Sequence, residues 1–87
     1  MTLDAIRNSL SYRDSISLEG TREILFLGYL VADYRVVNGC RVMVTLYNGI
    51  GRPRTNVLYP FVHDAVDRIV SHVDFLMRSS RLSDLAH

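Results

Sequence analysis

The chain has no lysine, because all ten of its basic residues are arginine. Lysine is normally among the commonest residues. Its absence reflects either a codon usage that favours arginine or selection for the planar guanidinium, which suits carboxylate, phosphate and interface contacts. The single cysteine, Cys40, excludes an internal disulfide and a zinc site with several cysteines. A reducing compartment is therefore the economical expectation.

Long apolar runs are lacking as well. The longest, from Ile24 to Ala32, has nine residues, whereas a membrane-spanning helix needs about 20. The chain does not open with a charged segment followed by an apolar core, so we expect no signal peptide. A net charge of +1 argues against an unspecific nucleic-acid binder and against an acidic DNA mimic. We expect a soluble, cytoplasmic protein.

What the chain does contain is enough apolar sequence for one small core. It has 87 residues, of which 48% are hydrophobic and 22% are charged. Such a composition is typical of a folded domain and not of a disordered tail. No repeat, low-complexity tract or linker divides the chain, so we expect a single domain over residues 1–87.

The first half of the chain predicts a helix followed by β-structure. Thr2 can cap a short helix in which Leu3, Ile6 and Leu10 recur at helical spacing. The alternation over residues 15–18 predicts a short strand, and residues 19–21 predict a turn. Residues 22–37 are rich in strand-forming residues. That length is unusual for one strand, so we expect a bulge or bend at Gly28.

A β-hairpin is predicted at Asn38–Gly39, which stand between two apolar segments. A loop of residues 37–39 keeps the apolar side chains on one face, whereas a two-residue loop mixes charges into that face. It places Cys40, Val42, Val44 and Leu46 opposite Val36, Tyr34, Ala32 and Leu30. We therefore expect a type I turn followed by a bulge, with Gly39 in the left-handed conformation.

The second half predicts one more strand and a long helix. The strand after the hairpin should end at Tyr47, and glycine and proline predict a loop over 48–54. A strand should follow over 54–59, and Pro60 suits the first turn of a helix over 61–79. The apolar stripe of this helix comprises Val62, Val66, Ile69, Val73 and Leu76, with Ala65, Val70 and Met77 beside it.

Together these elements predict the fold class and leave one segment open. We expect an α+β domain with a short N-terminal helix, an antiparallel sheet of three or four strands and a C-terminal amphipathic helix on one sheet face. The tail over 80–87 carries Leu82 and Leu85, and it is either docked or frayed.

No arrangement of residues predicts catalysis, a metal or a cofactor. His63 and His72 are nine residues apart and therefore on opposite faces of the predicted helix. His63 and Asp67 could offer two metal ligands, but such surface pairs are common. Cys40 is expected to be buried and inert, and the serines stand in no nucleophile motif. We therefore expect a protein that is not an enzyme.

The distribution of charge predicts one binding surface. Residues 34–60 contain Arg35, Arg41, Arg52 and Arg54 and no acidic residue, whereas residues 1–33 contain three arginines and five acids. Pro53 restricts the backbone between Arg52 and Arg54, so less entropy is lost when both guanidiniums bind carboxylates or phosphates. An acidic protein partner is the first candidate and nucleic acid the second.

Phe75 predicts a second binding surface because it breaks the helical pattern. It falls on the polar face of the last helix, near Arg68 and Arg78, which could flank its ring as cation–π neighbours. Either the leucines of the tail cover Phe75, or a partner or a second copy of the chain does.

The order helix, three strands, helix is also that of double-stranded-RNA-binding domains. Those domains hold phosphates with lysines at the start of the last helix, where this chain has His63 and Asp64, so we do not make that assignment. Our leading hypothesis is a non-catalytic protein–protein interaction protein, a stoichiometric inhibitor or adaptor of a larger protein or ribonucleoprotein complex. Small phage or viral inhibitors, including anti-CRISPR-like proteins, are analogous in class only. The alternative is an arginine-dependent nucleic-acid-binding module. A homodimer is slightly favoured over a monomer.

Overall fold

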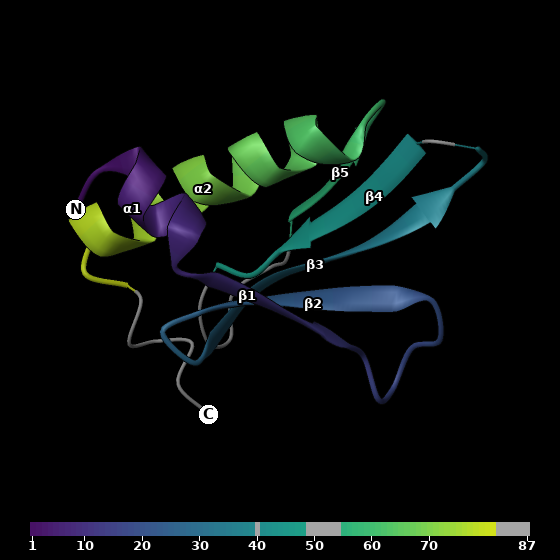
Figure 1. The fold of residues 1–87 in the computed structure, drawn as a ribbon, viewed down its shortest axis with the longest axis horizontal. Helices are drawn as coiled ribbons and strands as arrows, with labels where there is room; N and C mark the ends of the chain where they lie inside the picture. Colours follow the sequence, from purple (N-terminus) through teal and green to yellow (C-terminus); the bar gives the residue numbers. More distant parts are fainter. Residues whose placement is uncertain (40, 49–54, 82–87) are drawn as a thin grey trace.

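A computed structural model describes residues 1–39, 41–48 and 55–81. The chain is an α+β domain in which one helix precedes and one helix follows a meander of strands in the sequence, and the two helices lie together (Figure 1). The elements in chain order are α1 (Leu3–Asn8), β1 (Leu10–Asp14), β2 (Thr21–Phe26), β3 (Tyr29–Val37), β4 (Arg41–Leu46), β5 (Thr55–Tyr59) and α2 (Val62–Arg78).

The described strands form one antiparallel sheet in the order β1-β2-β3-β4-β5. Each strand is therefore bonded to its neighbours in the sequence, and β1 and β5 are its edges. The α2 helix lies across one face, which we call the inner face, and α1 packs against α2 (Figure 1). The expected α+β class is confirmed, whereas the expected three or four strands are corrected to five.

The additional strands lie in the first half of the chain. The prediction of a strand over residues 15–18 is wrong, because these residues form the connection from β1 to β2. The strand in this part of the chain lies earlier, over Leu10–Asp14. The single strand expected over 22–37 is two strands joined at Leu27 and Gly28. Both residues have positive φ, 52° and 84°, as a two-residue type I′ hairpin turn requires. The bulge lies elsewhere, where the register between β2 and β3 shifts after Ile24.

The hairpin between β3 and β4 confirms the predicted face and corrects the register. Val42 pairs with Val36 and not with Tyr34, so the register differs by two residues from the prediction. A shift of two keeps every side chain on its face, because side chains alternate along a strand. Gly39 has a φ of +79°, as predicted. Asn38 also has a positive φ, 39°, which a type I turn does not have at its central residues, so that turn type is wrong.

The core lies between α2 and the inner face of the sheet. Apolar side chains of α2 meet those of β2, β3 and β4, and Ile6 of α1 closes one end. The fully buried larger side chains are Ile6, Ile24, Phe26, Val31, Val42, Val44, Leu46, Ile69, Val70, Val73 and Leu76. The long helix begins one residue later than predicted, with Phe61 as its N-cap and Pro60 just before it. Val62, which was expected in the core stripe, is 41% exposed.

The helices leave part of the inner face uncovered. The α2 helix packs on β3, β4 and β5, and α1 has only six residues. On the half of β1 and β3 away from α1, inner-face residues stay accessible. Tyr12 pairs with Ile24, a core residue, and is nevertheless 44% exposed, while Val36 is 56% exposed. A hollow therefore remains between α2 and these strands.

Candidate functional site: an apolar groove beside α2

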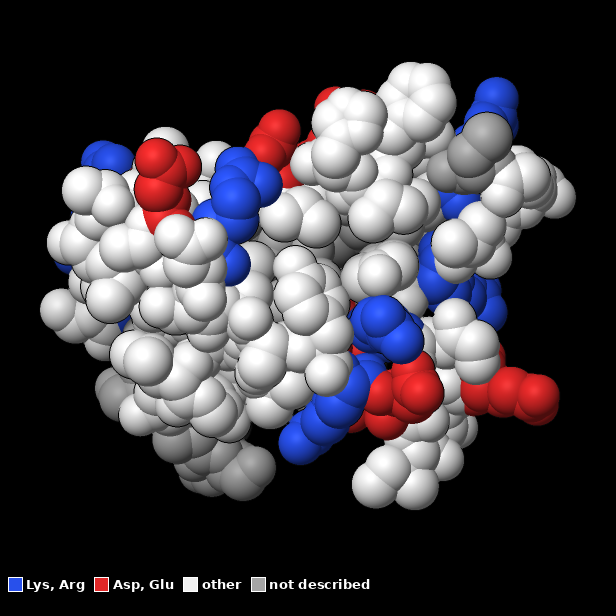
Figure 2. All heavy atoms as spheres, viewed as in Figure 1, with Lys and Arg blue, Asp and Glu red and all other residues white. Residues whose placement is uncertain are grey.

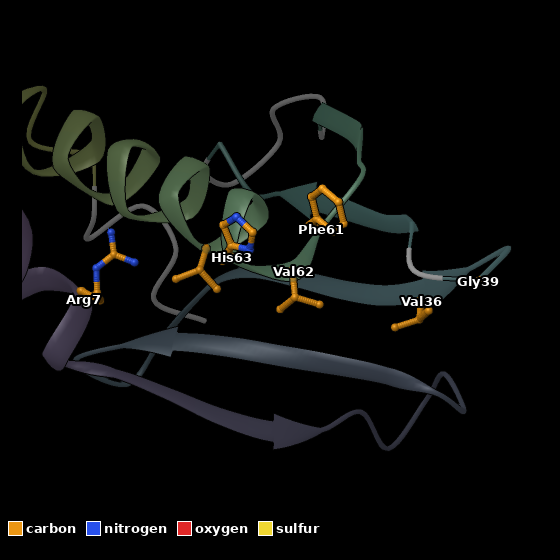
Figure 3. A pocket seen from close by; sticks show the side chains of 7 residues that line it. Arg7, Val36, Gly39, Phe61, Val62 and His63 are labelled. Atoms are coloured by element: carbon orange, nitrogen blue, oxygen red, sulfur yellow. The ribbon is translucent and has the colours of Figure 1, made fainter.

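Seven residues from three segments line this hollow, which we call the α2 groove. They are Arg7, Val36, Gly39, Phe61, Val62, His63 and Val66, and they surround a volume of about 730 Å³ (Figure 3). Arg7 comes from α1, Val36 and Gly39 come from the hairpin between β3 and β4, and the others come from the start of α2. Figure 2 shows uncharged side chains around a hollow in this part of the molecule, with charged groups near its ends.

Two aromatic rings form one wall of the groove. The rings of Phe61 and His63 are stacked, with centroids 5.6 Å apart and an angle of 10° between their planes. Phe61 is 52% exposed although it is the N-cap of α2, a position where its side chain makes no capping hydrogen bond. Ser, Thr, Asp and Asn are the usual N-caps, so capping does not explain a phenylalanine here. A half-exposed phenyl ring beside Val62 and Val36 is instead typical of a contact surface.

The end of the groove nearest α1 is closed by a charged pair. The Arg7 guanidinium donates a hydrogen bond to the Asp67 carboxylate of α2 at 2.5 Å, and both side chains remain partly exposed. Tyr12 of β1 is close enough to Arg7 to feel its charge, whereas Tyr34 lines the adjoining cavity described next. Burial raises the pKa of Tyr12 and Tyr34 raises it further, while Arg7 opposes them, so Tyr12 is a neutral phenol at neutral pH. This end can therefore offer guanidinium and phenol donors next to apolar surface.

The opposite end continues into a second cavity, which shares Val36 with the α2 groove. This adjoining cavity has a volume of about 490 Å³ and lies between the connection from β1 to β2 and strand β3. Its charged lining residues are Asp14, Glu19 and Arg22. The Arg22 guanidinium donates to the Asp14 carboxylate at 3.3 Å, and the Asp14 side chain is 86% exposed. The hollow thus runs from the Arg7–Asp67 pair at one end to two carboxylates and one guanidinium at the other.

The partner anchors predicted on α2, which are Phe75, Arg68 and Arg78, do not line the groove. Phe75 is 52% exposed on α2, as expected for an aromatic residue on its polar face. The cation beside its ring is Arg81, whose guanidinium carbon lies 5.9 Å from the ring centroid. Arg78 instead donates to Asp74, and the nearby Arg68 contributes to the environment of His72. Arg52, Arg54, Cys40 and the leucines of the tail lie outside the described residues, so those predictions are untested.

His72 is buried, and its role is structural. It is 3% exposed, and its Nε2 lies 2.7 Å from the backbone carbonyl oxygen of Tyr47 just beyond β4, to which it donates as the neutral ring. Burial lowers the pKa of His72, Arg68 lowers it further, and the hydrogen bond to Tyr47 opposes them. His63, on the opposite face, has a largely exposed side chain 3.4 Å from Asp64, and the two histidines are not brought together.

Other kinds of site find no support in the part of the chain that the structure describes. In residues 1–39, 41–48 and 55–81, no three His, Cys, Asp or Glu side chains are close enough to hold a metal ion. None of the helices in these ranges has the length and apolar character needed to cross a membrane.

Comparisons with protein families, with curated proteins and with solved structures found no match for this chain. The groove itself was missed by sequence reasoning, because its residues come from three segments that are distant in the sequence. One signal was present: Phe61 and Val62 follow Pro60 at a helix start, where a polar capping residue is the norm.

Proposed function

We propose that the chain is a non-catalytic protein-binding protein, an inhibitor or adaptor, whose partner contacts the α2 groove. The observation that carries the proposal is the gathering of half-exposed apolar side chains around one hollow: Val36 at 56%, Phe61 at 52% and Val62 at 41%. Each single exposed apolar residue is ordinary, but a contiguous set around a concavity is typical of an interaction site.

The size of the expected contribution follows from Phe61. A phenylalanine buries roughly 150–250 Å² when it is covered, and about half of that area is still exposed here. Covering about 100 Å² at about 25 cal/mol per Å² corresponds to about 2.5 kcal/mol. Truncating interface aromatics typically costs about 2 kcal/mol or more, so Phe61 is the expected anchor.

Photo-cross-linking tests where the partner binds. A photoreactive benzoylphenylalanine replaces either Phe61 or Phe75 in the full chain, and each protein is irradiated in a lysate of the source cells. The two positions are a matched pair because both are 52% exposed and both belong to α2 or its cap. We expect a discrete cross-linked protein at position 61, absent at position 75, and lost when Val36→Asp is added to the same chain.

Two results would contradict the proposal. A cross-linked protein at position 75 and none at position 61 would place the interface on the polar face of α2. Loss of the product after nuclease treatment would favour the alternative function, an arginine-dependent nucleic-acid-binding module.

A further inference from the structure

The uncovered part of the inner face has about the width of one helix. Neighbouring strands lie about 4.8 Å apart and a helix with its side chains is about 10 Å across, so one helix covers about two strands. The α2 helix packs on β3, β4 and β5. The rest of the inner face, on β1 to β3, carries Tyr12, Tyr34 and Val36. None of the described helices of this chain covers that part of the sheet.

The backbone of the groove favours a helical occupant over an extended one. Strand β2 is hydrogen-bonded to β1 on one side and to β3 on the other, and β3 is likewise bonded to β2 and β4. The floor of the groove therefore consists of side chains, and these strands have no free edge there. An extended peptide would lose water from its N–H and C=O groups without gaining backbone partners, which is costly. A helix bonds its own backbone and can offer an apolar face.

The charges at the two ends of the hollow complement a helix in one direction. At one end Arg7 is paired with Asp67, and at the other end Arg22 is paired with Asp14, which leaves the Glu19 carboxylate in excess there. A helix carries a partial positive charge at its N-terminus and a partial negative charge at its C-terminus. The favourable direction places the helix N-terminus near Glu19, so its C-terminus lies at the other end, beside the Arg7–Asp67 pair.

We infer that the α2 groove and the adjoining cavity bind an amphipathic α-helix of the partner protein, alongside α2, with its C-terminal end toward Arg7. The inference rests on the proposed function, since it names the part of the partner that enters the groove. The apolar face of that helix meets Val36, Phe61 and Val62, and its polar face stays in water.

The test uses a designed helical peptide as the probe. It has 14 residues, leucines at helical spacing on one face, and glutamine, glutamate and lysine on the other. The ¹⁵N-labelled full chain is titrated with it and observed by NMR. We expect the amide signals of Val36, Val62 and Val66 to shift, and those of Leu58 on the outer face and Phe75 to stay. The same peptide with two central prolines cannot form a helix and should bind at least tenfold more weakly.

A variant pair controls for unspecific binding. Val36→Asp should weaken binding of the helical peptide at least tenfold, whereas Leu58→Asp should leave it unchanged. Leu58 is 45% exposed and pairs with Met43 on the outer face, so it is a matched position. Equal binding of the helical and proline peptides, no binding at millimolar peptide, or shifts centred on Leu58 would each overturn the inference.

A spin label on the peptide tests its direction. A label at the C-terminus should broaden the amide signal of Arg7, and a label at the N-terminus should broaden that of Gly20. The reverse pattern would overturn the direction. The inference can fail separately from the proposed function: a cross-link at position 61 without peptide binding would retain the groove as the site and reject the helix. Failure of both would reject the groove.

Discussion

The packing of α2 can be tested with two substitutions that are chemically identical. Val73 is fully buried against the sheet, whereas Val62 is 41% exposed at the rim of the groove, and both belong to α2. Val→Ala removes the same two methyl groups at both positions. The helix propensity gained with alanine, about 0.5 kcal/mol, applies to Val73 in the interior of α2 and not to Val62, which is its first residue, so this gain is allowed for at Val73 before burial is compared.

The expected magnitudes differ clearly. At Val73 the lost transfer energy is about 1.6 kcal/mol and the residual cavity adds about 1 kcal/mol, so with the propensity gain the net cost is about 2 kcal/mol. At Val62 the side chain is already 41% exposed and its removal leaves no enclosed cavity, so the cost should stay below about 1 kcal/mol.

Urea denaturation followed by circular dichroism measures both values. We expect a lower midpoint for Val73→Ala at an unchanged slope, and a drop in melting temperature of about 8–16 °C for a domain of this size. Equal effects at the two positions, or the larger effect at Val62, would mean that α2 is rotated relative to the sheet and that the α2 groove is not as described.

Three further predictions concern the turns and His72. Leu27 has a φ of 52° in a two-residue turn that favours Asn-Gly, so Leu27→Asn should raise the unfolding free energy by about 0.5–1 kcal/mol; a lower urea midpoint would contradict this. Gly39 has a φ of +79° with open space around it, so Gly39→Val should cost about 1–2 kcal/mol through backbone strain alone, and Gly39→Asn clearly less in the same assay. Burial lowers the pKa of His72, so the unfolded chain binds a proton first, and the urea midpoint should fall as the pH drops below about 6.5. His72→Gln does not titrate and should remove that dependence between pH 7.5 and 5.5; an unchanged pH profile would show that His72 is not its source.

Local sequence signals predicted those parts of the fold in which residue type and conformation agree. Asn38–Gly39 was recognised as a hairpin because both residues tolerate positive φ, and the apolar period of α2 identified its buried side. Leu27–Gly28 was not recognised, because leucine is an uncommon residue at positive φ. The boundary between β2 and β3 at Leu27 was therefore not predicted.

The edge strand and the groove were missed for a different reason. Residues 11–14 of β1 are all exposed, so no alternation of apolar and polar residues marks them as a strand. Val62 continues the apolar period of α2, and only the tertiary arrangement shows that the sheet beneath it is open. Arg7, Val36 and Phe61 are brought together by topology, which no short-range pattern encodes.

Binding affinities of two phenylalanine variants test the central claim most directly. Once the cross-linked partner is purified, its Kd is measured for the parent chain, for Phe61→Ala and for Phe75→Ala, both positions being 52% exposed. The account predicts a Kd about 30-fold weaker for Phe61→Ala, corresponding to about 2 kcal/mol, and a change of less than about threefold for Phe75→Ala. A large loss for Phe75→Ala with an unchanged Kd for Phe61→Ala would contradict it.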